Sequence, residues 1–557
     1  MRAVWIQLDD ASERQARRSK IKNSMVPMKL KLFPALLLIL FGARTSALAQ
    51  GEDNPTGVTG IYNGNVTTAG SYDPYTRNAR RTVDDIVVPG SVGAYPLKWT
   101  RYYNSRHEGL GYDGCWDGWS FSYGYYWPSS GVTLPDGTVI NPDSDSFSGG
   151  LEYSFDNTTT TSTLLLPDGG KVRFSNPMQV IDPYGQITTI DFDSHGRRTR
   201  VTEPGGRYLQ INWDHPAGDI WANSVIQSVY AYSGPAGSPD DHVTQWVSYG
   251  WGGVQSGQNS YPGLSDVDYH DGTGALNTYT VIGGKPTNKR PGLIEADDVR
   301  YNGPMRQIGY NPDNKGAITQ ETKPSGEVVS SISSTINSPC LETRGDGATR
   351  SFTYGHGVAD GTRGKLLSYT DFEGHTTTLT YDPDMHSTSW GFINSVTDAN
   401  NYTTTYTRQA NSWGIKRITH PDGSHVDQTF WPNSSEGSPY YLASRTDELG
   451  HTTIYTRDSN NRITRKDYPN STYEEFTYNN LGQVLTHRMT SGGVESFTYD
   501  TRGLKMSSTD AMGNVTTFSY YTGSDFGGVW TDRVKTITHP PNASGFRAFG
   551  NFRIRSR

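Results

Sequence analysis

The chain has few cysteines, few charged residues and only one long apolar run. Two cysteines in 557 residues, Cys115 and Cys340, exclude a disulfide-stapled fold, and whether they pair is left open. The 49 basic and 56 acidic residues give a net charge of −7, so the chain lacks the positive field that attracts nucleic acid. Runs of Ala, Leu, Glu and Lys are also scarce, which argues against a helical bundle or coiled coil.

Glycine, proline and aromatic residues are abundant instead. The chain has 62 Gly, 30 Pro and 35 Tyr, and aromatic residues reach 12%. These residues favour turns and strands, and the aromatic content argues against disorder. The length is enough for a large core. The composition therefore predicts an all-β protein.

The apolar run near the N-terminus has the parts of a signal peptide over residues 28–49. Met28-Lys29-Leu30-Lys31 is a basic start, residues 32–41 are apolar, and the small residues before Gln50 predict cleavage after Ala49. This run is shorter than the roughly 20 residues that span a membrane, so no transmembrane anchor is predicted. Residues 1–27 read as mis-assigned upstream sequence and residues 50–79 as a linker. We therefore expect a secreted or cell-surface protein.

A period of 21 residues runs through the C-terminal part of the chain. The recurring positions are Phe476, Phe497 and Phe518; Tyr478, Tyr499 and Tyr520; Gly482 and Gly503; and Asp500, which follows Tyr499. Each unit holds an alternating strand with aromatic residues on one face and Thr on the other. The rings are expected to pack within the sheet, so no unit is expected to be stable without its neighbours.

A second signature is an Asp followed three residues later by Gly or Asn and six residues later by Thr. It begins at Asp182, Asp371, Asp398, Asp447 and Asp510. An Asp at a turn accepts backbone N–H bonds, Gly or Asn relaxes φ, and Thr begins the next strand. A Pro-Asp-Gly element at Pro135, Pro167 and Pro421 predicts further hairpin turns.

The strand patterns suggest three parts after the linker. Residues 80–164 form a β module with a different alternation, and residues 165–540 carry the repeats. Between residues 215 and 340 the rhythm loosens, which predicts longer loops and no new domain. Residues 541–557 are expected to be irregular.

These patterns resemble the RHS or YD-repeat family, named for the Tyr-Asp that closes each unit, as at Tyr381-Asp382 and Tyr499-Asp500. The resemblance extends to residues 80–127 through Val88-Pro89-Gly90 and Gly118-Trp119. It implies tandem hairpins joined edge to edge into a continuous spiralling sheet, a partial shell or cocoon, behind an N-terminal β module. Some bacterial members enclose a C-terminal toxin in that shell, and related animal proteins act in cell contact.

The chain departs from the family at its C-terminal end. The core signature, Pro followed by Asp-Pro-x-Gly-Leu, is not found, nor is an effector after it, and Asp182-Pro183-Tyr184-Gly185 is a fragment inside a repeat. Residues 541–557 therefore read as the truncated end of a toxin-delivery-type protein, and a missing C-terminal half or effector is a candidate partner.

No catalytic, cofactor-binding or metal-binding residue is predicted. Residues 109–114 match a dinucleotide pattern without the strand and helix that such a site needs, and therefore read as a loop. Residues 141–146 lack the Gly and the distal Glu of a calcium loop. His375 and His451 occupy equivalent turn positions, which favours a structural role.

The sequence therefore predicts an exported, non-enzymatic protein whose sheet serves containment, presentation or adhesion. Glycans or cell-surface proteins are candidate partners. One alternative is a carbohydrate-binding cell-surface protein, in which exposed Tyr or Trp stacks on sugars. A second is a secreted β-propeller hydrolase with blades of about 40 residues.

Overall fold

The computed structural model is almost entirely strands and tight turns. It describes residues 72–73, 78–90, 92–104, 118–125, 132–135, 139–140, 155–156, 162–166, 170–214, 224–256, 259–270, 274–282, 290–298, 307–311, 317–322, 328–333, 340–355, 365–382, 393–408, 415–431, 441–521, 534–541 and 547–551. The segments 1–27 and 28–49 with Ala49, the linker up to residue 71, Cys115 and the segments 109–114 and 141–146 lie outside these residues. Cys340 is buried.

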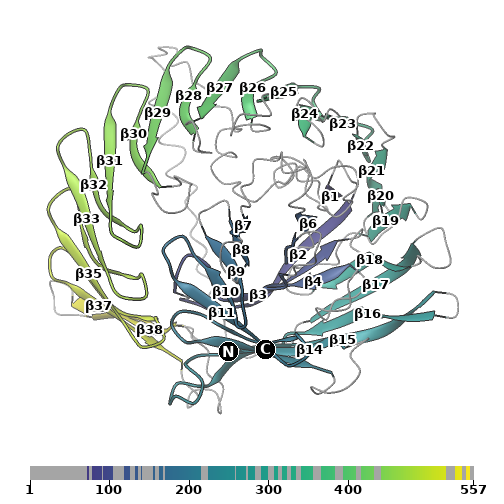
Figure 1. The fold of residues 1–557 in the computed structure, drawn as a ribbon, viewed down its shortest axis with the longest axis horizontal. Coiled ribbons are helices and arrows are strands. Elements are labelled where there is room, and N and C mark those ends of the chain that lie inside the picture. Colours follow the sequence, from purple (N-terminus) through teal and green to yellow (C-terminus); the bar gives the residue numbers. More distant parts are fainter. Residues whose placement is uncertain are drawn as a thin grey trace, which may run out of the picture. The chain divides into compact units, whose positions relative to one another are not determined.

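Every regular element of the described residues is a β-strand, so the predicted all-β class is confirmed (Figure 1). Across the same residues, no helix reaches the length and apolarity needed to cross a membrane.

One antiparallel sheet has twelve strands, each paired with the next along the chain. Its strands are β7 (Phe155–Asp156), β8 (Ser162–Leu165), β9 (Lys171–Phe174), β10 (Met178–Ile181), β11 (Ile187–Phe192), β12 (Arg198–Thr202), β13 (Tyr208–Trp213), β14 (Ile226–Tyr232), β15 (Val243–Ser256), β16 (Asn259–Asp268), β17 (Gly274–Ile282) and β18 (Arg290–Asp298). Strands β15 to β18 fall where longer loops are expected, and β15 has 14 residues. The strand-like alternation in the sequence covers residues 243–251, and the structure extends this strand through Gly252 and Gly253 to Ser256.

The other large sheet has 25 strands. Its repeat strands, which pair consecutively, are β19 (Gln307–Asn311), β20 (Ala317–Thr322), β21 (Val328–Ser333), β22 (Cys340–Arg344), β23 (Thr349–Tyr354), β24 (Leu366–Thr370), β25 (Thr376–Tyr381), β26 (Ile393–Thr397), β27 (Thr403–Arg408), β28 (Ile415–Thr419), β29 (His425–Phe430), β30 (Leu442–Thr446), β31 (Thr452–Arg457), β32 (Ile463–Asp467), β33 (Tyr473–Tyr478), β34 (Val484–Arg488), β35 (Val494–Tyr499), β36 (Lys505–Thr509), β37 (Val515–Tyr520), β38 (Val534–Pro541) and β39 (Arg547–Asn551). Strand β39 lies within the segment expected to be irregular.

Four N-terminal strands join this second sheet. They are β1 (Tyr72–Asp73), β2 (Asn78–Val87), β3 (Lys98–Asn104) and β4 (Trp119–Phe121). Strand β2 pairs with β3 and also meets β20 at Asn78 and Ala317. A separate two-stranded sheet consists of β5 (Val132–Thr133) and β6 (Val139–Ile140).

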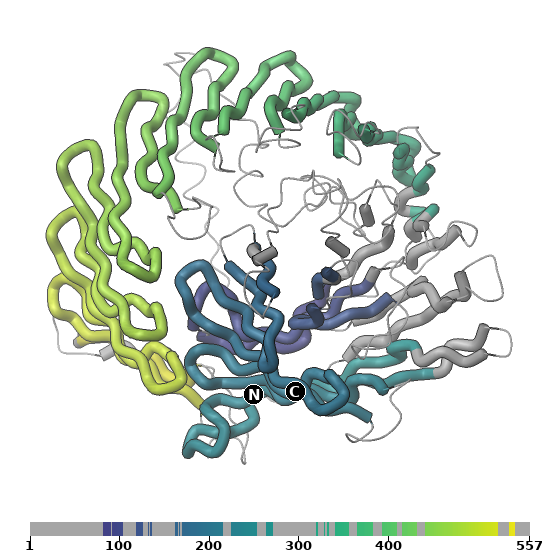
Figure 2. The backbone as a smooth tube through the Cα atoms, in the orientation of Figure 1, coloured from purple at the N-terminus to yellow at the C-terminus, as the bar shows by residue number. Residues whose placement is uncertain are grey.

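This topology is not that of a propeller. Blades of about 40 residues would be separate sheets of four strands each, whereas the described strands β19 to β39 continue edge to edge in one sheet. The propeller alternative is therefore wrong for the described part of the chain. Figure 2 follows the backbone from hairpin to hairpin along β30 to β37.

The Asp-x-x-Gly motifs form one kind of tight turn. At Asp500, Oδ1 accepts the backbone N–H groups of Arg502 (2.9 Å) and Leu504 (2.8 Å), and Gly503 takes a φ of 81°. Only glycine adopts this φ without strain, although Asn401 occupies the same turn position with a φ of 62°. Equivalent pairs of backbone bonds are accepted by Asp182, Asp371, Asp398, Asp447 and Asp510.

Several repeat strands end in a tyrosine that is held by a hydrogen bond across the hairpin. Tyr499 donates from its hydroxyl to the carbonyl oxygen of Val484, the first residue of the preceding strand, at 2.9 Å. The same 15-residue step is bridged by Tyr381, Tyr478 and Tyr520. On the opposite face, hydroxyl pairs such as Thr498 and Ser507 (2.6 Å) join neighbouring strands. Side-chain hydrogen bonds on both faces of the sheet therefore fix the pairing register of neighbouring repeat strands.

Burial of the aromatic face changes along the repeats. The tetrapeptide Ser-Phe-Thr-Tyr occurs at residues 351–354 and 496–499. Phe352 is fully buried, whereas Phe497 in the same register is half-buried. Buried apolar residues such as Leu379 and Ile418 continue through β24 to β29, whereas strands β30 to β37 contain no buried residue.

A dense aromatic and ionic core lies between β2 to β4 and β14 to β16. Trp99 and Phe121 stack at 5.4 Å, and Phe121 contacts Tyr249 of β15 at 5.1 Å. The buried Arg101 donates from Nε to Asp85 at 2.9 Å. This core fixes the N-terminal strands against the first sheet.

Candidate functional site

The turns of the repeat sheet divide into two rims, because successive turns of an antiparallel meander lie at opposite ends of its strands. The docked rim consists of the turns at residues 458–462, 479–483 and 500–504. The free rim consists of the turns at residues 371–375, 398–402, 420–424, 447–451, 468–472, 489–493 and 510–514.

Apolar contacts attach the docked rim to the N-terminal part of the chain. Leu504 is 2% exposed, and its Cδ2 lies 2.9 Å from the position that a Cβ would take at Gly90. Val92 likewise places a methyl group 2.9 Å from the Cβ position of Gly503. Because glycine has no Cβ, Gly90 leaves space for Leu504 and Gly503 leaves space for Val92. The docked rim and the N-terminal segment therefore pack closely against each other.

Hydrogen bonds extend this contact, and we call the whole of it the seam. Gln186, in the turn between β10 and β11, donates from Nε2 to the carbonyl oxygen of Asn480 at 3.1 Å. Tyr441 donates from its hydroxyl to the carbonyl oxygen of Pro183 at 2.5 Å. These bonds join residues 294 and 258 positions apart in the sequence.

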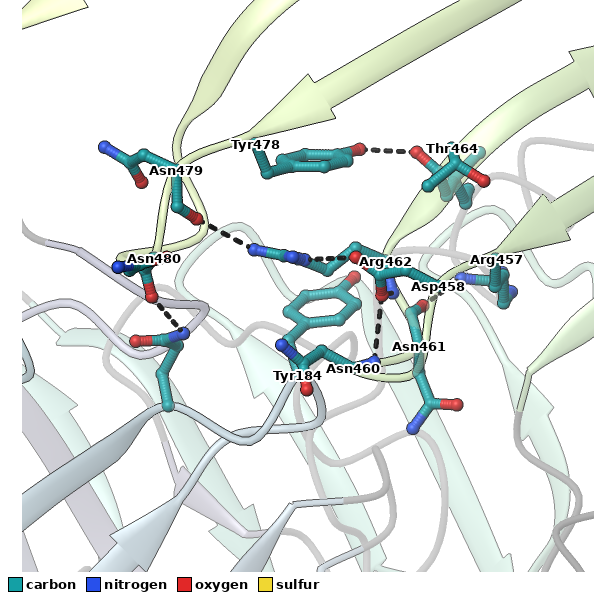
Figure 3. Close-up of polar contacts among 12 residues, drawn as sticks. Tyr184, Arg457, Asp458, Asn460, Asn461, Arg462, Thr464, Tyr478, Asn479 and Asn480 are labelled. Carbon is teal, nitrogen blue, oxygen red and sulfur yellow. Dashed lines mark hydrogen bonds and ion pairs between the residues drawn. The ribbon is translucent and has the colours of Figure 1, made fainter.

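Side chains also link one docked turn to the next. Arg462 donates to Asp458 within its own turn (2.7 Å) and to the carbonyl oxygen of Asn479 in the next (3.0 Å), as Figure 3 shows. Gln483 then donates to the carbonyl oxygen of Gly503 at 2.7 Å. The three docked turns therefore act as one rigid edge.

Among the described residues, the free rim forms no hydrogen bond to the N-terminal strands, although some of its own turns are linked, as His420 Nε2 is to Glu448 at 3.2 Å. A Cβ added at Gly374, Gly423, Gly450 or Gly513 would meet no atom within 4 Å. Leu449 and Met512, at the third turn position, are 80% and 87% exposed.

The predicted turn aspartates lie either at the seam or on the free rim. Asp182 and Asp500 lie at the seam, where Asp182 also accepts the backbone N–H of Ala94 at 2.6 Å. Asp371, Asp398, Asp447 and Asp510 lie on the free rim. Backbone hydrogen bonds to His451 and Leu449 help to hold the pKa of Asp447 below its usual value.

The sequence did not single out the residues that make the seam. Gln186, Tyr441, Val92 and Leu504 have no periodic signal, because their partners lie in distant parts of the chain. Among the described residues, no group of three or more His, Cys, Asp or Glu side chains is arranged to hold a metal ion.

Replacing Gly503 by alanine is expected to destabilise the protein more than replacing Gly513. Both residues have φ near 80°, 81° and 83°, so each alanine costs about 1–2 kcal/mol of backbone strain. At Gly503 the new methyl group also meets Val92, which adds about 1–3 kcal/mol of overpacking. Urea unfolding of the two variants measures the difference, and equal losses would show that the seam is not formed.

Comparisons with known proteins give a distant likeness. No family model matches the chain, and no curated protein matches it. Among 74 similar chains of solved structures is a mutated Tc holotoxin pore of Photorhabdus luminescens, with 11% identity and a TM-score of 0.37 over 85% of this chain and 26% of that one. TcdB2-TccC3 without its hypervariable C-terminal region has 11% identity and a TM-score of 0.31 over 85% and 26%.

A third similar structure is shorter. The N-terminal domain of effector protein SpvB from Salmonella typhimurium strain LT2 has 12% identity and a TM-score of 0.17, over 42% of this chain and 95% of that one. The chain spans about a quarter of the length of the first two structures. Since all these TM-scores are below 0.5, the likeness does not establish a shared fold.

Proposed function

We propose that the chain is an exported scaffold of the RHS or YD-repeat type, whose sheets contain or present another polypeptide or act in adhesion at the cell surface. The docked rim is the observation that carries this proposal. The turns of the docked rim attach this end of the sheet to the N-terminal part of the chain and so fix the shape of the sheet there. A sheet that encloses another polypeptide needs such a rigid surface. This role of the repeats requires no catalytic residue.

The aromatic face of β30 to β37 supports the same role. Its half-buried rings alternate with charged side chains of both signs, among them Lys466, Glu474, Glu495 and Lys505. Such a face is too polar for a sealed core and suits contact with a polypeptide or with water.

The carbohydrate-binding alternative is less well supported at these rings. Sugars stack on open aromatic faces, but His487 covers Phe476 at 4.6 Å with an interplanar angle of 5°. On the opposite face of the sheet, Arg465 and Arg488 likewise lie over Tyr473 at 3.7 and 3.9 Å.

A protease-protection experiment tests containment. An unfolded reporter with protease sites is fused after Arg557, and its digestion is followed in the unaltered chain, in Leu504→Asp and in Leu449→Asp. We expect protection in the unaltered chain and in Leu449→Asp, which alters the exposed free rim, and digestion in Leu504→Asp, which breaks the seam. Digestion of the reporter in the unaltered chain as fast as the free reporter would refute containment.

Export is tested separately. Mass spectrometry of the protein recovered outside the bacterial cytoplasm should find a mature N-terminus at Gln50.

A further inference from the structure

Ser248, Asp268 and His270 meet on one face of the twelve-stranded sheet. Ser248 lies in β15 and pairs directly with Asp268 at the end of β16, and His270 follows two residues later. None of the repeat motifs includes these residues. The backbone bond from His270 to Asp268 is of the kind found in the repeat turns, as at Asp500, but that turn type does not account for the contact of Ser248 with His270.

The three side chains are connected in the order that activates a serine. The hydroxyl of Ser248 lies 2.7 Å from Nε2 of His270. The other ring nitrogen, Nδ1, lies 3.5 Å from Oδ2 of Asp268. The backbone N–H of His270 also donates to Oδ1 of Asp268 at 2.7 Å. In hydrolytic triads the base uses Nε2 toward the serine and Nδ1 toward the carboxylate, as it does here.

The opposite face of these strands is buried, which makes the site rigid. Val247 and Val267, next to Ser248 and Asp268, are 0% and 2% exposed. Tyr269, between Asp268 and His270, accepts a hydrogen bond from Nη2 of Arg101 at 2.8 Å and donates to Asp85 at 3.0 Å. The core thus anchors the residue that separates the carboxylate from the imidazole.

The backbone at His270 is held in an uncommon conformation. Its φ is 55°, in the left-handed region, which only a few per cent of non-glycine residues adopt. Strained residues of this kind cluster at functional sites, because the surrounding structure must compensate for them. Here the strain directs the imidazole back over the strand, toward Ser248.

Two aromatic residues complete the site. Trp246, two residues before Ser248 on the same face, stacks on the ring of His270 at 5.0 Å, and Tyr230 of β14 stacks on Trp246 at 6.2 Å. The side chains of His270 and Asp268 are 30% and 57% exposed, so a ligand can reach them. A substrate bound here would place an apolar or aromatic group against the stacked rings of Trp246 and Tyr230.

We propose that Ser248, His270 and Asp268 form an esterase-type site for small carboxylic esters with an aromatic or apolar group. This activity goes beyond the proposed scaffold function and does not depend on it. Oγ of Ser248 attacks the ester carbonyl carbon while Nε2 of His270 takes the hydroxyl proton. The carbon–oxygen bond to the leaving alcohol breaks, and the imidazolium returns the proton to that alcohol. Water then gives a proton to Nε2 of His270 and attacks the acyl carbon, the bond from that carbon to Oγ of Ser248 breaks, the carboxylic acid leaves, and the imidazolium returns the proton to Oγ.

A second Ser–His contact in the same chain is an internal control. Ser194 Oγ lies 3.2 Å from Nδ1 of the adjacent His195. There the carboxylate of Asp193 accepts the backbone N–H of His195. This pair uses Nδ1 toward the serine, so it should remain unreactive.

Labelling of the full chain with a fluorophosphonate probe, followed by peptide mass spectrometry, tests the proposal. We expect modification at Ser248 and none at Ser194, loss of labelling in Ser248→Ala, and at least a tenfold slower reaction in His270→Gln and Asp268→Asn. The rate of hydrolysis of p-nitrophenyl phenylacetate should likewise be lost in Ser248→Ala and fall at least tenfold in His270→Gln and Asp268→Asn.

A further variant separates positioning from folding. Tyr269→Phe should lower kcat for this ester with little change in KM, because it loosens the segment that carries Asp268 and His270. Circular dichroism and urea unfolding show whether each variant is folded. Equal labelling of Ser248 and Ser194, or labelling of Ser248 that His270→Gln leaves unchanged in a folded protein, would overturn the proposal.

Discussion

Replacing Arg101 by methionine is expected to lower the free energy of unfolding by about 3–5 kcal/mol, because it leaves the buried carboxylate of Asp85 without its cation. The side chains of Arg101 and Asp85 are 2% and 0% exposed, and their Nε–Oδ1 distance is 2.9 Å. Burial by itself lowers the pKa of Arg101, but Asp85 and the two nearby phenols raise it above its usual value. Without Arg101, the buried carboxylate of Asp85 keeps the hydroxyl groups of Tyr249 (2.6 Å) and Tyr269 (3.0 Å) as donors but loses the guanidinium that offsets its charge.

An exposed ion pair in the repeat sheet is the matched control. Arg417 and Asp427 form a two-pronged pair at 2.6 and 2.8 Å, with side chains that are 46% and 35% exposed. Exposed pairs contribute about 0–1 kcal/mol, so Arg417→Met should have a small effect. Urea unfolding followed by tryptophan fluorescence measures both variants. A loss for Arg101→Met no larger than that for Arg417→Met would contradict the buried core.

Phe352→Ala is expected to cost about 3–5 kcal/mol, the usual loss for a fully buried ring. Phe497→Ala should cost less, because Phe497 occupies the same place in Ser-Phe-Thr-Tyr but remains half-buried. The two substitutions remove the same side chain from the same tetrapeptide, which occurs once in β23 and once in β35. Their difference therefore measures how burial of the aromatic face changes along the sheet.

Chemical denaturation of both phenylalanine variants, under the conditions used for the unaltered chain, gives this difference. Similar losses would mean that the aromatic face is equally covered in β23 and β35. A larger loss for Phe497→Ala would reverse the described gradient.

Local features of the fold could be predicted from the sequence because they depend on residues close in the chain. The turn at Asp500 needs only its own carboxylate and Gly503 three residues on. The alternation in Glu495 to Tyr499 likewise places Phe497 and Tyr499 on one face. These interactions recur every 21 residues and therefore leave a visible period.

The seam and the serine site could not be predicted in this way. Gln186 and Asn480 are 294 residues apart, and no periodic rule links them. Ser248 and His270 meet only because β15 and β16 pair in one register, which the sequence of neither strand reveals by itself. The sequence Asp268-Tyr269-His270 is a weak indication of an acid–base pair. Only the pairing of β15 with β16 shows that Ser248 lies beside it.

Amide hydrogen exchange of β30 to β37 in the full chain tests most directly whether neighbouring hairpins stabilise one another. Each inner strand has bonded neighbours at both edges. We therefore predict slow exchange at both edges of β31 to β36, with protection lost together as urea is added. Fast exchange along one edge of every hairpin, each opening independently of the next, would contradict a continuous sheet.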